Sequence, residues 1–398
     1  EFQKVAKDYG ETIKLELSPE AAINEACKNS GLKDFGDEDF ISRLDVLMRS
    51  VSNDEGLAGI GKLGIFNDQV RYLENRLKFE KFKKEFPEYQ EEIISKPIII
   101  IGLPRSGTTH LLNLIASDSR LKSLPYWQSL RPFKEKLLDL ENDQDSRQEE
   151  AFKEYESFLQ TMPLLKSMHD MHPNHIHEEI ELQAIDFSTY LPEWLAYVPE
   201  WRDYYLTHDQ INHYQYLRDV LKAMQFIQGP KKWVLKSPQH LEQIPSLLKT
   251  FPDATFAITY RDPLSVVLST ATMLSYGDRV RRYKVEPENN FNYWHNRIKT
   301  LLERFTEDYQ LIPADQKCDI FFQDLIKDNL NSVKNIYSKN SFKFDKLAND
   351  EIKEYMNSNK RGKHGQVIYN LEDFGVDKSE SYESFKFYFD EFDVLKEI

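Results

Sequence analysis

The spacing of hydrophobic residues divides the chain into two parts. In the first part apolar side chains recur every three or four positions, as in Phe40, Leu44, Leu47 and Val51. Such spacing places an apolar stripe along one face of a helix, so this part is predicted to be helical. We therefore expect a helical N-terminal extension over residues 1–95 and the main domain over residues 96–398.

After residue 96 the pattern changes to short, continuous apolar runs, which are typical of strands buried on both faces. The runs are 98–101, 233–235, 254–260 and 319–322. Helices are expected between them over 207–226 and 241–250, the first with Thr207 and Gln210 as a capping box. A closing amphipathic helix is expected over 382–398. This alternation predicts an α/β fold with a parallel sheet.

Composition narrows the class of partner and the compartment. The net charge of −14 over 398 residues disfavours nucleic acid, because phosphate backbones are bound by basic surfaces. No apolar run approaches the ~20 residues of a membrane span, so no transmembrane segment is expected. Cys27 and Cys318 make neither a disulfide framework nor a zinc knuckle. With no secretory signal in the first residues, a cytoplasmic location is expected.

A candidate anion-binding loop follows the first strand. After Gly102 the chain continues into an apolar helix through Leu103-Pro104-Arg105-Ser106-Gly107-Thr108-Thr109-His110. Backbone N–H groups at the start of a helix attract anions, and Gly107 lets the backbone approach a ligand closely. The arginine and the three hydroxyls of this loop add further donors.

Two alternatives for this loop stay open. Gly102 and Gly107 have the spacing of the ATP/GTP loop, G-x-x-x-x-G-K-[ST], but Thr108 stands in place of its lysine. That substitution disfavours a nucleotide phosphotransferase. The other alternative is an ordinary strand–turn–helix connection without a ligand, which the concentration of donor side chains disfavours.

A second candidate phosphate site follows the strand at 254–260. Arg261 ends this strand, and Asp262-Pro263 suits a helix start with aspartate at the N-cap and proline at the first position. Ser269 lies eight positions after Arg261. Both could face one phosphate if Arg261 folds back along the helix, while an arginine paired with a surface carboxylate is the alternative.

Residues 104–109 resemble the 5′-phosphosulfate loop of sulfotransferases that use 3′-phosphoadenosine-5′-phosphosulfate (PAPS), commonly Pro-Lys/Arg-Ser-Gly-Thr-Thr. The resemblance covers about residues 96–375 and implies that 96–398 is a sulfotransferase domain with a P-loop-like, three-layer fold around the parallel sheet. It implies that PAPS and its desulfated product PAP bind, with no metal required. The residues implied at the 5′-phosphate and sulfate are Arg105, Ser106, Gly107, Thr108 and Thr109. His110 stands where the family often has a tryptophan that stacks near the adenine.

The same resemblance places the 3′-phosphate of the donor. Arg261 and Ser269 match in type and spacing the arginine and serine that bind it in the family. Lys360, Arg361 and Gly362 resemble a late basic loop that closes over this phosphate. Residues 369–375 resemble the C-terminal part of a broad, largely bacterial branch of the family.

Sulfuryl transfer needs cations near the departing 5′-phosphate and a group that takes the acceptor's proton. Arg105 is one candidate cation, and Lys236 is another because strand C-termini form the ligand edge of a parallel sheet. His240 is the candidate base, by resemblance to the Lys-Thr-His-Leu-Pro stretch of cytosolic sulfotransferases, although two extra residues separate it from Lys236. Glu179 is the rival base, because some carbohydrate sulfotransferases use a glutamate.

Two further clusters bear on the acceptor. Between residues 168 and 181 lie His169, His172, His175, His177, Glu178, Glu179 and Glu181. Such density also occurs in zinc sites, but we expect no metal. We expect a structural loop or a role beside the acceptor, where Glu178 or Glu179 could orient or deprotonate it. The aromatic-rich stretch 187–205 predicts core packing or an apolar pocket for a small hydroxyl- or amine-bearing acceptor such as a sterol, lipid or phenol. A non-catalytic nucleotide-binding protein is the remaining alternative.

Overall fold

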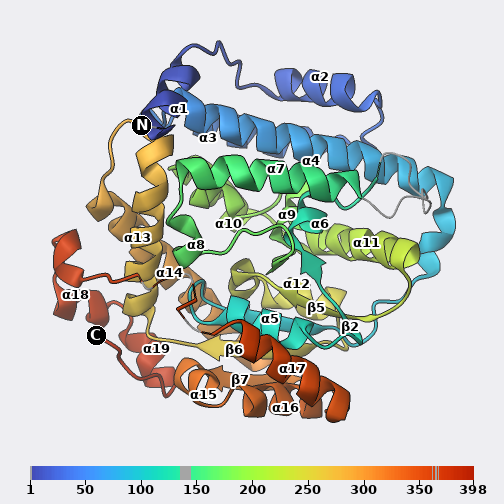
Figure 1. Cartoon of the computed structure of the whole chain (residues 1–398), viewed down its shortest axis with the longest axis vertical. Helices are drawn as coiled ribbons and strands as arrows, with labels where there is room; N and C mark the ends of the chain where they lie inside the picture. The colour runs from blue at the N-terminus through green and yellow to red at the C-terminus, as the bar shows by residue number, and fades with distance from the viewer. Residues whose placement is uncertain (1, 135–144, 361, 364, 366) are drawn as a thin grey trace.

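A five-stranded parallel sheet forms the centre of the molecule (Figure 1). The structure is a computed structural model that describes residues 2–134, 145–360, 362–363, 365 and 367–398. The strand order is β2-β5-β1-β6-β7. The strands are β1 (Ile98–Gly102), β2 (Leu121–Lys122), β5 (Lys232–Lys236), β6 (Thr255–Tyr260) and β7 (Lys317–Phe321). The predicted α/β fold with a parallel sheet is therefore confirmed.

The central strand β1 shows why its sequence is an unbroken apolar run. Ile98 and Ile100 face one hydrophobic cluster, while Ile99 and Ile101 face another. Neighbouring side chains of a strand point to opposite faces, so a strand covered on both sides needs apolar residues throughout. This confirms the expected three layers.

Helices cover both faces of the sheet. One face packs against α5 (Thr108–Ala116), α16 (Asn329–Lys339) and α17 (Lys346–Ser358). The other packs against α11 (Ile211–Gln228), α12 (Ile244–Thr250), α13 (Pro263–Arg281) and α14 (Pro287–Asp308). A small antiparallel pair, β3 (Leu124–Pro125) and β4 (Ile176–His177), lies apart from the main sheet. The connection between them carries α6 (Tyr126–Leu130), α7 (Ser146–Thr161) and α8 (Leu165–Met168).

Four α-helices precede residue 96 in the described part of the chain. They are α1 (Phe2–Glu11), α2 (Pro19–Ser30), α3 (Phe40–Ser52) and α4 (Gly59–Glu85), and Figure 1 shows them together at the top of the molecule. Two of them, α3 and α4, share the main hydrophobic core. Phe79 and Phe82 of α4 belong to the same buried cluster as Ile99 of β1. Phe79 also stacks on Phe133, with ring centroids 5.3 Å apart. The division of the chain at residue 96 stays a prediction.

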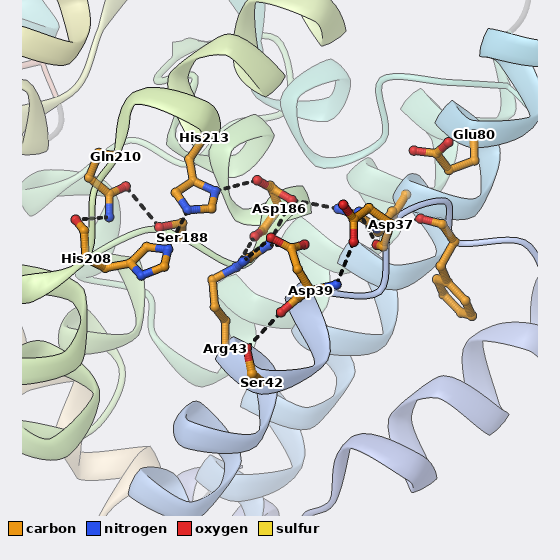
Figure 2. Close-up of polar contacts among 12 residues, drawn as sticks. Asp37, Asp39, Ser42, Arg43, Glu80, Asp186, Ser188, His208, Gln210 and His213 are labelled. Atoms are coloured by element: carbon orange, nitrogen blue, oxygen red, sulfur yellow. Dashed lines mark hydrogen bonds and ion pairs between the residues drawn. The ribbon is translucent and has the colours of Figure 1, made fainter.

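A buried ion cluster joins these N-terminal helices to the rest of the molecule (Figure 2). Asp186 ends η2 (Ala184–Asp186), and its Oδ1 accepts hydrogen bonds from Arg43 of α3 at 3.2 Å and Arg76 of α4 at 2.7 Å. Its Oδ2 lies 2.5 Å from Nδ1 of His213 on α11. The pKa of Asp186 stays below its ordinary value: burial alone would raise it, but His213 and the two arginines outweigh burial.

The boundaries of the predicted helices differ from the structure in three places. The expected helix over 207–226 is present as α11 but begins at Ile211, because Thr207 ends α10 (Pro199–Thr207) and its hydroxyl bonds back to carbonyls of α10 instead of capping α11. The predicted capping box is therefore wrong. The expected helix over 241–250 is split into η4 (Pro238–Glu242) and α12, whose second residue, Pro245, lacks the N–H needed to continue a helix.

The predicted single closing helix over 382–398 is also wrong. The chain forms α18 (Lys378–Glu383) and α19 (Lys386–Glu391) with Phe385 between them, fully buried in the core. Burying Phe385 turns the chain between the two short helices. Within the described residues, no helix combines the length and apolar character needed to cross a membrane.

We expect Asp186→Asn to lower the free energy of unfolding by about 3–5 kcal/mol, because two buried guanidinium groups lose their carboxylate. Chemical denaturation at pH 7 measures this loss. Since the pKa of Asp186 is depressed in the folded state, its contribution is present above the ordinary carboxyl pKa of about 4 and is lost as the pH falls further. The difference in unfolding free energy between the parent and Asp186→Asn should therefore become smaller at acidic pH.

The matched control is Asp203→Asn, which removes a carboxylate that is 67 % exposed and pairs with Arg202. It should change the unfolding free energy by no more than about 0.5 kcal/mol. Equal effects of the two variants would contradict a stabilising role for the buried cluster.

Candidate active site

The candidate active site lies at the carboxyl edge of the sheet, where β1, β5 and β6 end next to one another. This edge is the usual ligand side of an open parallel sheet. β1 leads into the loop 103–107, β5 ends in Lys236, and β6 leads into Arg261. The fold thus gathers three candidate segments that are far apart in sequence.

Buried hydrogen bonds of the Ser106 hydroxyl stabilise the loop after β1. The Ser106 hydroxyl donates to the Leu103 carbonyl at 2.6 Å and lies 2.7 Å from Oγ1 of Thr259 on β6. A Cβ at Gly102 would come within 1.9 Å of the same Thr259 oxygen, so only glycine fits there. Gly107 precedes α5 with a φ of 89°, and Phe322 and Leu325 pack against it. Ser106 therefore shapes the loop with its side chain buried.

The other loop residues face two different neighbours. The Thr109 hydroxyl accepts a hydrogen bond from Lys236 Nζ at 3.2 Å. His110 Nε2 lies 2.8 Å from Asn329 Oδ1. The Thr108 side chain is buried at the start of α5. Of the site residues predicted from the sequence, the structure thus brings Thr109 together with Lys236.

Arg105 and Arg261 lie side by side with Ser269. Arg105 Nε donates to Ser269 Oγ at 3.1 Å, and Arg261 Nη1 donates to the Arg105 carbonyl at 2.6 Å. Burial and then the charge of Arg261 lower the pKa of Arg105 to about 10, so both groups are cationic at neutral pH. The sequence pairs Arg261 with Ser269, whereas in the structure Arg105 contacts the serine and Arg261 bonds to the Arg105 carbonyl.

Tyr369 lies at the same cluster and was not identified from the sequence as a site residue. Burial would lower the pKa of Arg261, but Glu397 first and then Tyr369 raise it. An electrostatic interaction with Tyr369 also raises the pKa of Arg105, against the larger effects of burial and Arg261. Lys360 and Gly362 are exposed, Gly362 has a φ of 77°, and Arg361 lies outside the described residues. The structure gives no contact of Lys360 or Gly362 with either arginine.

A second charged group surrounds Lys236 and is almost fully enclosed. Lys236 Nζ pairs with the Glu178 carboxylate, and its backbone N–H donates to Glu179 Oε2 at 2.7 Å. Glu179 Oε1 lies 2.5 Å from His240 Nε2, and His240 Nδ1 lies 2.8 Å from the Tyr214 hydroxyl. The side chains of His240 and Glu179 are each 1 % exposed, against 14 % for Glu178. Both ring nitrogens of His240 are therefore engaged inside the protein.

Two of the clustered histidines lie near these cations. Nε2 of His169 and Nε2 of His177 are 3.3 Å apart. Burial, then Arg105 and Lys236, hold the pKa of His169 well below its ordinary value, and burial and His169 do the same for His177. Both rings are therefore neutral at pH 7. His172 packs instead against Phe152 and Tyr155. Among the described residues no group of three or more His, Cys, Asp or Glu side chains is arranged to hold a metal ion.

This arrangement places two cationic side chains and the start of a helix at the ends of the central parallel strands of an α/β protein. A comparison with known protein families matches residues 97–345, more than half of the chain, to the sulfotransferase family. The chain belongs to that family, whose reaction class is transfer of a sulfate group. No functionally curated protein matched the chain.

Solved structures agree with this assignment at the level of the fold. The sulfotransferase STF9 from Mycobacterium avium is 19 % identical, with a TM-score of 0.85 over 97 % of this chain and 99 % of its own. The sulfotransferase STF1 from Mycobacterium tuberculosis H37Rv is 24 % identical, with a TM-score of 0.77 over 92 % of this chain and 97 % of its own. The predicted sulfotransferase fold is thus confirmed, and the structural match also extends over helices before residue 96, which the sequence did not assign to that fold.

We expect Gly107→Ala to destabilise the protein more than Gly31→Ala does. Both glycines have a left-handed backbone, with φ values of 89° and 68° and ψ values of 1° and 5°, so alanine adds about 1–2 kcal/mol of backbone strain at either position. A Cβ at Gly107 would also lie 3.1 Å from Phe322 and Leu325, whereas no atom lies within 4 Å at Gly31. Denaturant titration of both variants measures the difference. Equal losses would mean that Phe322 and Leu325 move aside freely.

Proposed function

We propose that this chain is a PAPS-dependent sulfotransferase that moves a sulfuryl group onto a hydroxyl or amine of a small acceptor. The observation that carries the proposal is the cluster of Arg105, Arg261 and Ser269 beside the loop 103–107. Two adjacent guanidinium groups repel each other, and Glu397 neutralises only Arg261, so an anion bound at Arg105 would lower this repulsion. PAPS is a polyanion with phosphates at both ends of its adenosine, which suits such a pair.

The charges of the described residues fit this donor. Arg105 contacts the Ser269 hydroxyl and has no carboxylate within ion-pair distance in the described part of the chain. Its position at the start of the loop before α5 adds backbone N–H groups that point at an anion. Arg105 and the loop would hold the 5′-phosphosulfate, and Arg261 with Ser269 the 3′-phosphate. Lys360, Arg361 and Gly362 remain proposed as the closing loop.

The chemistry asked of the chain is positioning and stabilisation of charge. PAPS supplies the sulfuryl group and leaves as PAP, so negative charge grows on the 5′-phosphate side. Arg105 and Lys236 are the cations placed to stabilise it. Thr109 holds the Lys236 ammonium near the loop by accepting its hydrogen bond. The acceptor oxygen forms the new S–O bond and gives up its proton to a base of the protein.

Glu178 is the base that the geometry favours. A base must reach the acceptor, and Glu178 is the more exposed carboxylate of the pair beside Lys236. The other candidates from the sequence, His240 and Glu179, are both buried and bonded to each other. We therefore propose that His240 positions Glu179, and that Glu179 holds the segment that presents Glu178.

We further propose a hydroxyl-bearing sterol, lipid or phenol as acceptor. Most aromatic residues of the stretch 187–205 are core residues: Phe187, Tyr190, Trp201 and Tyr205 are buried. Trp194 and Tyr197 instead line a cavity of about 460 Å³ together with Tyr293. These rings provide one apolar wall, but most residues that line the cavity are polar or charged, and none of them is Arg105, Glu178 or Lys236. The acceptor proposal therefore rests on the aromatic content of the stretch rather than on this cavity.

Arg261→Ala and Ser269→Ala should each weaken the binding of PAP, the arginine variant by on the order of 100-fold because it removes a charge-assisted contact to phosphate. Isothermal titration calorimetry in EDTA measures this, since we expect no metal requirement. Arg304→Ala, at an exposed arginine that faces Glu307, is the control and should bind PAP like the parent. ATP in place of PAP should not bind. Parent-like PAP affinity in Arg261→Ala would contradict the 3′-phosphate assignment.

Glu178→Gln should lower turnover with PAPS by about 10²–10⁴-fold while leaving PAP affinity within a few-fold of the parent, because it loses the proton acceptor. Transfer of radiolabelled sulfate to a panel of phenols, sterols and amines measures turnover, and calorimetry measures PAP affinity. Glu200→Gln, an exposed glutamate bonded to Arg49, is the control.

The variant His240→Gln distinguishes the two assignments of the base. If His240 positions Glu179, the variant should lose stability along with activity. An equal loss of turnover with an unchanged unfolding free energy would restore His240 as the base. A protein that binds PAP but transfers sulfate to no acceptor would favour a non-catalytic binding function.

A further inference from the structure

The side chain of Arg261 is already occupied by a carboxylate from a distant part of the chain. Arg261 Nε lies 2.9 Å from Glu397 Oε1, and Arg261 Nη2 lies 2.7 Å from Glu397 Oε2. The third nitrogen, Nη1, donates to the Arg105 carbonyl, and the guanidinium plane stacks over Phe322 at 4.0 Å. A bidentate carboxylate of this kind has the shape and charge sign of a bound phosphate edge.

We propose that Glu397 is an intramolecular competitor of the nucleotide's 3′-phosphate for Arg261, and that it thereby sets the affinity for PAPS and PAP. The proposal rests on the proposed function, because it takes Arg261 as the 3′-phosphate ligand. In the free chain the carboxylate neutralises Arg261, a cation that is 12 % exposed. When the nucleotide binds, its 3′-phosphate replaces Glu397 on the guanidinium.

The main chain around Glu397 is held independently of its carboxylate. The Glu397 backbone N–H donates to Asp262 Oδ2 at 2.7 Å, and the Tyr382 hydroxyl donates to the same carboxylate at 2.8 Å. Val394 and Ile398, on either side, pack against the main core. A rotation of the Glu397 side chain is therefore enough to release Arg261, without displacement of the segment.

There is room for that rotation. Glu397 and Arg261 line a cavity of about 270 Å³ together with Phe322 and Asp393. The Glu397 side chain is 22 % exposed, so its carboxylate can regain water when it leaves Arg261. The phosphate carries more negative charge than the carboxylate and so displaces it. The apparent affinity is lower than the intrinsic one, because only the fraction of molecules with Arg261 released is ready to bind.

Competition and positioning give opposite expectations. If Glu397 competes with the 3′-phosphate, removing its charge tightens PAP binding. If Glu397 only orients Arg261 for the phosphate, removing its charge weakens PAP binding. The nucleotide 5′-AMP lacks the 3′-phosphate, so its binding should be indifferent to Glu397 in the first case.

The experiment compares Glu397→Gln with the parent by calorimetry, using PAP and 5′-AMP as ligands. We expect Glu397→Gln to bind PAP about tenfold more tightly, the effect of removing one charge-assisted competitor, and to bind 5′-AMP within about twofold of the parent. Asp393→Asn removes a second acid of the same cavity that no hydrogen bond joins to Arg261. It should shift PAP affinity by less than about twofold. Glu397→Asp, with a shortened reach, should fall between parent and Glu397→Gln.

Unchanged or weaker PAP binding in Glu397→Gln would overturn the proposal, as would an equal gain for 5′-AMP or for Asp393→Asn, which would indicate a general charge effect. If PAP binds the parent but gains nothing in the variants, this proposal alone fails. If PAP binds neither parent nor variants, the proposed function fails and this inference fails with it.

Discussion

The buried carboxylate of Glu179 is the contact on which the geometry of the candidate active site depends. A carboxylate withdrawn from water is stable only when its oxygens are paired. Glu179 finds one partner in the backbone N–H of Lys236, the last residue of β5, and another in the ring of His240. The segment carrying Glu179 is thereby tied to the ligand edge of the sheet. Its neighbour Glu178 then lies against the Lys236 ammonium, which Thr109 holds beside the anion-binding loop.

The positive charges of Arg105 and Arg261, on the other side of the site, are neutralised to different extents. Arg261 has a carboxylate partner in Glu397, whereas Arg105 contacts a serine hydroxyl and the charge of Arg261. A chain with a net charge of −14 can still present a cationic surface locally, because the potential in a pocket follows the charges nearest to it. Arg105 can therefore pair with an anionic ligand directly, whereas Arg261 must first release Glu397.

Several parts of the fold and site could be predicted from the sequence because they depend on local patterns. A strand buried on both faces needs apolar residues at every position, and the run at Ile98–Gly102 shows this pattern directly in the sequence. The loop residues around Gly107 and the arginine after β6 were also identified from their types and order. Helix ends were less predictable. The Thr207 hydroxyl bonds to carbonyls of the helix that it ends instead of capping the next helix, and burial of Phe385 interrupts the last amphipathic stretch.

The sequence by itself determined the parallel α/β sheet, the strand–turn–helix of the candidate anion-binding loop and the residue types that lie in it. Only the tertiary structure decided which of those residues meet and which reach solvent. His240 and Glu179 resemble active-site residues in sequence, but burial pairs them with each other and leaves Glu178 as the more exposed acid. Glu397 contacts Arg261 across 136 positions of sequence, a contact that no local pattern encodes. Burial and ion pairing depend on neighbours brought together by folding, whereas the period of a helix or strand depends on residues next to one another in the chain.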